Sequence, residues 1–172
     1  MAAGPPAAGE RKPSTKEEKK KINTAACDGD LNTLQLLHKE GVDVTGVVND
    51  ANWTGLHFAA FFGHYNVASS LLDWGCEVDV VCVSQYACMA SYVIKWTPLH
   101  YAASMGHTNV VTLLVGKGAD VNMKDKDGRT PLENAVSENK SGPVDYFINT
   151  VGMDPTQYDQ ETQQDIKRLG II

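Results

Sequence analysis

The chain has 172 residues, the length of one ordinary globular domain, and its composition of 42% hydrophobic and 21% charged residues is that of a soluble protein. Its net charge of −6 is unevenly distributed: residues 1–21 carry six Lys and Arg against three Glu, whereas the remainder carries nine basic and eighteen acidic residues. An acidic body argues against a nucleic-acid partner, and no apolar run is long enough to span a membrane.

The N-terminal stretch, Met1 to Gly9, is rich in Ala, Gly and Pro and has no apolar h-region. The sequence therefore predicts a disordered tail over residues 1–14 and no signal peptide. The four cysteines show neither a Cys-x-x-Cys pair nor an accompanying His-x-x-x-His, so we expect no metal site; they are Cys27, Cys76, Cys82 and Cys88. Reduced thiols and a cytoplasmic, and also nuclear, location follow as expectations.

A first helix is predicted to begin near Thr15 or Lys16. Ser14-x-x-Glu17 and Thr15-x-x-Glu18 are both capping-box patterns, in which a hydroxyl and a later carboxylate each accept a backbone N–H. The apolar side of this helix consists of Ile22, Ala25 and Ala26.

The stretch from Trp96 to Asn122 carries the clearest local signals. Thr97 suits a helix N-cap and Pro98 the first helical position, whereas Gly106 suits the left-handed conformation that ends a short helix. A second apolar helix follows and stops at Gly118; its apolar residues are Val110, Val111, Leu113 and Leu114.

Thr-Pro-Leu-His-x-Ala-Ala, Gly-His and Gly-Ala-Asp-Val-Asn follow one another at the spacing of an ankyrin repeat, and the stretch closely resembles that family. The resemblance implies an all-α fold: an ankyrin-repeat solenoid of stacked helix-turn-helix units with short hairpin fingers and no conventional sheet.

Related residues recur along the chain with the spacing of such repeats. The step is 34 residues from Gly29 to Gly63, 43 from Gly63 to Gly106, and 33 from Thr97 to Thr130. We therefore predict an ankyrin-repeat domain over residues 15–155 with four units, at about 17–49, 50–82, 92–124 and 125–155. The first and last units are atypical: the first lacks Thr-Pro-Leu-His, and in the last Glu133 replaces the usual His and Glu138-Asn139 replaces Gly-His.

The 43-residue step indicates an insertion of about ten residues, at about 83–92. This segment is apolar and rich in β-branched and aromatic residues, and it has no Gly or Pro, which is poor loop chemistry. Three interpretations remain open: a longer finger packed on its neighbours, a partner-binding loop, or a splice or gene-model product.

Residues 156–172 form a C-terminal cap or tail. Thr156-x-x-Asp159 suits the start of a short helix through Arg168. Its apolar residues would cover the open end of the stack, and a free peptide ligand is the alternative; they are Tyr158, Ile166, Leu169, Ile171 and Ile172.

The histidines are interpreted as structural. The resemblance implies that His57 and His100 bond to backbone between adjacent repeats, whereas His64 and His107 follow a helix-ending Gly, where a polar group near the carbonyl ends is expected. No phosphate-binding loop, Ser-His-Asp set or paired-carboxylate cleft is evident, so we expect no enzymatic activity and no cofactor.

The resemblance also predicts a partner-binding surface. In each unit the residue before the Thr of Thr-Pro-Leu-His and the pair before Gly-His face the concave side of the stack. These positions hold types that are enriched at interface cores, and the predicted contact residues are Trp53, Phe61, Phe62, Trp96, Ser104, Met105 and Arg129, with Ser137 and Glu138 in the last unit.

Asn122 is a candidate for hydroxylation. Ankyrin repeats that are substrates of an asparaginyl hydroxylase resemble this one, because Leu114 lies eight residues before Asn122, and Asp120 and Val121 immediately precede it. The alternative is that Asn122 serves only to stabilise its turn.

The predicted function is a non-catalytic protein–protein interaction module, acting as adaptor, scaffold or inhibitor, that binds its partner as a monomer on the concave surface. The alternative is a recruiting or regulatory subunit of a ubiquitin-ligase or chromatin complex. No recruitment motif for such a complex is evident in residues 152–172.

Overall fold

The computed structural model describes residues 11–83 and 95–172, and in these residues the chain is helical. Isolated bridges, Lys12 with Val42 and Val47 with Thr54, are the β-type pairing found there. The α-helices of the described part are α1 (Lys16–Asp28), α2 (Leu31–Lys39), α3 (Gly55–Phe62), α4 (Tyr65–Asp73), α5 (Pro98–Met105), α6 (Thr108–Gly116), α7 (Pro131–Ser137), α8 (Ser141–Asp145) and α9 (Gln160–Arg168). A π-helical turn, Tyr146–Thr150, and a 3₁₀ turn, Pro155–Gln157, lie between α8 and α9.

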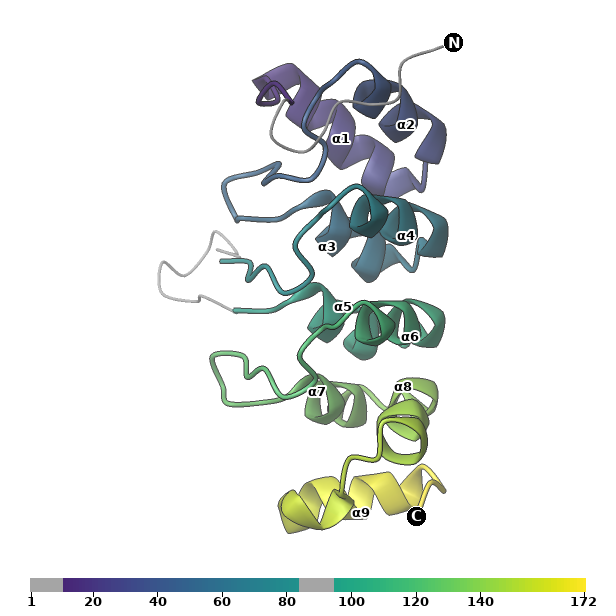
Figure 1. The fold of residues 1–172 in the computed structure, drawn as a ribbon. Coiled ribbons are helices and arrows are strands. Elements are labelled where there is room, and N and C mark those ends of the chain that lie inside the picture. The colour runs from purple at the N-terminus through teal and green to yellow at the C-terminus, as the bar shows by residue number, and fades with distance from the viewer. Residues whose placement is uncertain (1–10, 84–94) are drawn as a thin grey trace.

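The helices form antiparallel pairs that stack into a single array (Figure 1). The first helices of the pairs, α1, α3, α5 and α7, pack on one another in sequence, and α4, α6 and α8 form the second column. The loops between pairs project as fingers on the side of the first helices (Figure 1). We call the surface made by the fingers and the first helices the inner face. This architecture confirms the all-α solenoid predicted from the sequence.

Each first helix begins with a capping box. Thr15 Oγ1 accepts the N–H of Glu18 at 3.2 Å, and Glu18 Oε2 accepts the N–H of Thr15 at 2.7 Å. In α7 the carboxylate of Glu133 accepts the N–H of Thr130 at 2.7 Å, the bond that His100 Nδ1 makes with Thr97 at 3.2 Å in α5. Glu133 therefore takes the place of the usual His without loss of the cap, because both side chains offer an acceptor three residues after the N-cap.

The last repeat differs from the sequence interpretation by one residue. Asn139 has φ +60°, the left-handed conformation that Gly106 adopts at φ +85° one repeat earlier. The pair in the place of Gly-His is therefore Asn139-Lys140, and the assignment of Glu138-Asn139 is wrong. Asn is one of the few non-glycine residues that readily adopt this conformation.

A continuous core runs from the first helix to the last. It is made mainly of buried aliphatic residues, with Phe147, Tyr101 and two cysteines, and its largest fully buried hydrophobic members are Ile22, Leu34, Leu56, Leu71, Leu99, Leu114, Leu132, Phe147 and Ile166. In α6 Leu114 is fully buried, whereas Leu113 is half-buried. Ile166 of α9 belongs to this core, so the final helix packs on α7 and covers the end of the stack. The helix starts after Asp159, whose carboxylate accepts the N–H of Thr162 at 2.7 Å, rather than at Thr156.

Residues 11–14 are not a free tail. The backbone of Lys12 donates to the carbonyl oxygen of Gly41 and accepts from the N–H of Asp43, both at 3.1 Å. Arg11 donates to the carbonyl oxygen of Trp74 at 3.0 Å. These long-range bonds correct the predicted disorder for residues 11–14; residues 1–10 lie outside the described part of the chain.

Candidate partner-binding surface

Hydrogen bonds within each finger fix its last residue next to the N-terminus of the following helix. In the first finger, Val48 N–H donates to the carbonyl oxygen of Trp53 at 2.7 Å, and Asn49 Oδ1 accepts the N–H groups of Ala51 and Trp53, both at 3.0 Å. Asp125 repeats this arrangement in the last finger, where its carboxylate accepts the N–H of Arg129 at 3.0 Å. These side-chain bonds place Trp53 and Arg129 on the inner face.

The middle finger is closed at its base in the same way. Cys82 N–H donates to the carbonyl oxygen of Trp96 at 2.9 Å, as Val48 does to Trp53. Thirteen residues separate Cys82 from Trp96, whereas four separate Val48 from Trp53. Apart from Val83, whose N–H donates to the carbonyl oxygen of Ala51 at 2.8 Å, the predicted insertion 83–92 lies outside the described residues.

The two finger tryptophans meet at one tyrosine. The ring of Tyr101 lies 4.7 Å from that of Trp53 and 4.9 Å from that of Trp96. Phe61 extends the group, since its ring lies 5.8 Å from Tyr101 and 4.9 Å from Phe62. We call these five residues the aromatic strip. Tyr101 was not predicted from the sequence; it occupies the variable place of Leu-His-x-Ala, and only its neighbours in the fold reveal its role.

The predicted contact residues differ in accessibility. Phe62 is 46% exposed, Arg129 is exposed, and Trp53, Phe61, Trp96 and Met105 are half-buried; Ser137 and Glu138 are exposed. Ser104 is only 1% exposed, because it lies on the buried side of α5, and it is therefore removed from the set of contact residues. Trp96 also has a structural bond, since its Nε1–H donates to Asp125 Oδ2 at 3.0 Å.

Three histidines bond to a neighbouring repeat. His64 Nε2 lies 2.8 Å from the carbonyl oxygen of Cys27, and His107 Nε2 lies 3.0 Å from that of Phe61, so each imidazole bonds to the preceding repeat. His100 Nε2 lies 3.4 Å from the carbonyl oxygen of Arg129 in the next finger, as the resemblance implied, whereas His57 Nε2 makes no hydrogen bond to the described residues, contrary to that expectation. Burial lowers the pKa of His57 to about 4 and also lowers that of His100, so both imidazoles are neutral at pH 7.

Asn122 lies on the surface in the turn after α6. Its backbone N–H donates to Asp120 Oδ1 at 2.9 Å, and Asp120 N–H donates to the carboxylate of Asp79 at 3.1 Å. The carboxylate of Asp120 therefore stabilises the turn, and the amide side chain of Asn122 is exposed to solvent.

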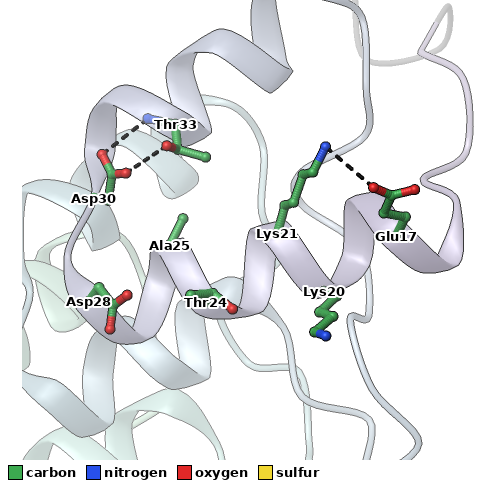
Figure 2. Close-up of a pocket in the computed structure, with 8 residues that line it drawn as sticks. All are labelled: Glu17, Lys20, Lys21, Thr24, Ala25, Asp28, Asp30 and Thr33. Carbon is green, nitrogen blue, oxygen red and sulfur yellow. Dashed lines mark hydrogen bonds and ion pairs between the residues drawn. The ribbon is translucent and has the colours of Figure 1, made fainter.

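A hollow of about 540 Å³ lies on the outer surface of the first repeat (Figure 2). Some of the polar groups that line it bond to one another: Lys21 pairs with Glu17 at 3.7 Å, and Asp30 accepts the N–H of Thr33 at 3.2 Å. This polar surface suits the first unit of a stack, whose outer side meets water. Over residues 11–83 and 95–172, no group of three or more His, Cys, Asp or Glu is arranged to hold a metal ion.

Within the part of the chain that the structure covers, none of the helices has the length and apolar character needed to cross a bilayer.

Comparison with known proteins agrees with this geometry. Residues 82–159 match the family model "Ankyrin repeats (3 copies)" and residues 23–72 match "Ankyrin repeats (many copies)", so the two matches cover about three-quarters of the chain. A region of 66 residues is 35% identical to the proteins named Ankyrin repeat domain-containing protein 40 of Mus musculus and Homo sapiens. It represents 38% of this chain and 18% of each relative, so the match spans about a fifth of the length of these curated relatives.

Proposed function

The chain belongs to the ankyrin-repeat family, whose repeats form a protein–protein interaction module, and from this premise we propose that it binds a partner protein through the aromatic strip on its inner face. In this role it acts as a non-catalytic adaptor, scaffold or inhibitor.

The observation that carries the proposal is the continuity of the strip across two repeats. Trp53 and Trp96 belong to different fingers, yet both rings contact Tyr101, and Phe61 leads from there to Phe62. Tyr101 itself is only 5% exposed and supports the strip from beneath, so the accessible part of this apolar strip is formed by the two tryptophans and the two phenylalanines, which are types enriched at interface cores. Met105 precedes Gly106 as Phe62 precedes Gly63, so it extends this surface into the third repeat.

Phe62 is the most informative residue of the strip. Its side chain is 46% exposed at the end of α3, and the core cluster does not include it. Removal of its ring should therefore affect partner binding more than folding. Leu36 is 58% exposed on α2, the second helix of the first pair, and provides a matched apolar control.

The experiment is affinity purification with quantitative mass spectrometry on three versions of the full chain: wild type, Phe62→Ala and Leu36→Ala. We expect a protein that co-purifies with wild type and Leu36→Ala and is strongly depleted with Phe62→Ala. Proteins retained equally by all three, or lost only with Leu36→Ala, would place the binding surface elsewhere.

The tryptophans need a second measurement, because they also stabilise the fold. We expect Trp53→Ala and Trp96→Ala each to weaken partner binding by about 2 kcal/mol. Their effect on unfolding should be smaller than that of Leu114→Ala, a fully buried truncation that costs roughly 2–5 kcal/mol. Partner affinity and the urea midpoint, measured on the same variants, separate the two effects. Tryptophan variants that unfold early but bind normally once folded would identify the strip as core.

A further inference from the structure

Three lysines without an ion pair lie at one end of the inner face. Lys16, Lys19 and Lys20 line a hollow of about 710 Å³ between α1 and the first finger; the other lining residues are Ser14, Asn23, Val48, Asn49 and Asp50. In the described residues none of these three ammonium groups lies within 4.0 Å of a carboxylate, whereas the neighbouring Lys12 and Lys21 pair with Glu18 and Glu17, each at 3.7 Å. We call Lys16, Lys19 and Lys20 the lysine cluster.

The position of the lysine cluster is unfavourable for the helix itself. All three residues lie in the first five positions of α1, at the positive end of the helix dipole, where a cation is destabilising and an anion is attracted. Lys20 lines both this hollow and the one on the outer surface of the first repeat, where Figure 2 shows it without a bond to the paired Lys21 and Glu17. Three ammonium groups and one carboxylate, that of Asp50, line the hollow at the positive end of the helix dipole, and this excess of positive charge favours an anionic group there.

The hollow adjoins the aromatic strip. Lys19 lies 34 residues before Trp53, one repeat step, although Lys19 is the fourth residue of α1 whereas Trp53 precedes the N-cap of α3. Asn49, which lines the hollow, accepts the backbone N–H of Trp53 at 3.0 Å. A segment that covers the strip can therefore extend directly over the lysine cluster.

The charge at the opposite end of the inner face is negative. A second hollow, of about 290 Å³ beside α7 and α9, is lined by Arg129 and by five carboxylates; these are Asp127, Glu133, Asp159, Glu161 and Asp165. An acidic segment is repelled there and attracted at the lysine cluster, so the charges allow only one placement of such a segment along the stack.

We infer that the partner is recognised through a segment that carries Asp or Glu residues beside an apolar anchor. Its carboxylates pair with the lysine cluster while its anchor covers the aromatic strip. This inference rests on the proposed function, because the anchor uses the same strip.

The test starts from a display library of random 16-residue peptides, selected on the full chain. We expect the selected peptides to carry an aromatic or large aliphatic residue with two or more Asp or Glu on one side of it. One such peptide, labelled with fluorescein, is then titrated at low salt against wild type, Lys16→Gln/Lys19→Gln and Lys39→Gln/Lys167→Gln. The last variant removes the same charge from two exposed lysines outside both hollows.

We expect the Lys16→Gln/Lys19→Gln protein to bind the peptide about 5–10-fold more weakly and with a smaller dependence on salt, whereas Lys39→Gln/Lys167→Gln should bind within about twofold of wild type. The urea midpoint of the Lys16→Gln/Lys19→Gln protein should be no lower than that of wild type, since the two lost charges oppose the helix dipole of α1.

Other outcomes separate this inference from the proposed function. Peptides that depend on Phe62 but show no acidic enrichment and no loss with Lys16→Gln/Lys19→Gln would overturn the inference and leave the proposed function intact. Acidic peptides that depend on the lysine cluster but not on Phe62 would overturn the proposed function and the shared anchor. Equal lysine-dependent binding of a single-stranded oligothymidylate would overturn the assignment to a protein segment.

Discussion

His107 Nε2 lies 3.0 Å from the carbonyl oxygen of Phe61, and the imidazole ring covers Gly63 closely. A Cβ on Gly63 would lie 2.6 Å from His107 Nδ1, so the absence of a side chain at Gly63 lets the histidine of one repeat reach the last turn of the preceding first helix. His64 makes the same contact with Gly29, where the corresponding separation is 2.7 Å. The Gly and the His of the Gly-His pattern therefore act between repeats as well as within one.

This contact predicts a large difference between two glycine substitutions. Gly75→Ala should cost about 1 kcal/mol, because Gly75 has φ +93° but open space around the new Cβ. Gly63 has a similar φ of +79°, but a Cβ at this position must also displace His107. Gly63→Ala should therefore cost about 1–3 kcal/mol more than Gly75→Ala. Urea unfolding of both variants measures the difference, and equal midpoints would show that the histidine contact contributes nothing.

Stability should fall in mild acid because of His57. Its pKa is about 4 in the folded protein, against an ordinary value of 6.5, owing to burial. The unfolded chain therefore binds the proton first, so the stabilisation is complete above pH 6.5 and is lost as the pH falls towards 4. The slope approaches about 1.4 kcal/mol per pH unit and the total is about 3 kcal/mol.

His57→Gln isolates this contribution, because Gln can cap the helix in the same position but does not titrate. Between pH 6.5 and 4.5 the free energy of unfolding of wild type should fall more steeply with pH than that of His57→Gln. The difference in slope should correspond to about one additional proton bound on unfolding. Parallel curves for the two proteins would show that His57 titrates normally.

The middle finger should tolerate deletion of residues 83–92. The bond between Cys82 and Trp96 closes the finger at its base, and the deletion leaves three residues between them, as between Asp125 and Arg129. We expect an unchanged helical circular dichroism spectrum and a melting temperature within a few degrees of wild type. A large loss of melting temperature would show that these residues are packed structure.

A deletion of equal length provides the control. Removal of residues 42–51 eliminates Val42, Val44 and Val48, all of which are buried, and should prevent folding.

Residues 11–14 should contribute measurably to stability. Deletion of residues 2–14 removes the Arg11 bond to Trp74 and the two backbone bonds of Lys12, whereas deletion of residues 2–10 retains them. Because a typical hydrogen bond contributes about 0.5–1.5 kcal/mol and ordering the segment offsets part of this, we expect the longer deletion to be less stable by about 1–2 kcal/mol. Coincident urea transitions of the two truncated proteins would contradict this expectation.

Asn122 is accessible to a modifying enzyme, since it is exposed and its turn is stabilised by Asp120. We expect a fraction of the protein isolated from cells to carry an additional mass of about 16 daltons at this residue, the mass of one oxygen. Peptide mass spectrometry of wild type and Asn122→Ala tests this. The same added mass in the peptide from Asn122→Ala, or none in wild type, would remove the proposal.

The sequence by itself determined the repeats and the ends of their helices, because those signals are local. Thr97 and Pro98 start α5 and Gly106 ends it through the conformations of single residues and bonds within one turn. The fingers, and the positions of Trp53, Trp96 and Arg129 on the concave side, were predicted from the resemblance to ankyrin repeats.

Only the tertiary structure decided what depends on neighbours that are distant in the chain. Ser104 and Met105 are adjacent in sequence, yet the first is buried and the second half-buried, because the packing of α5 against the neighbouring helices covers one side of it. Tyr101 joins two tryptophans, and Arg11 bonds to a residue 63 positions away. Such contacts form only when the repeats stack, since each repeat alone leaves these surfaces open, and no pattern within a single repeat encodes them.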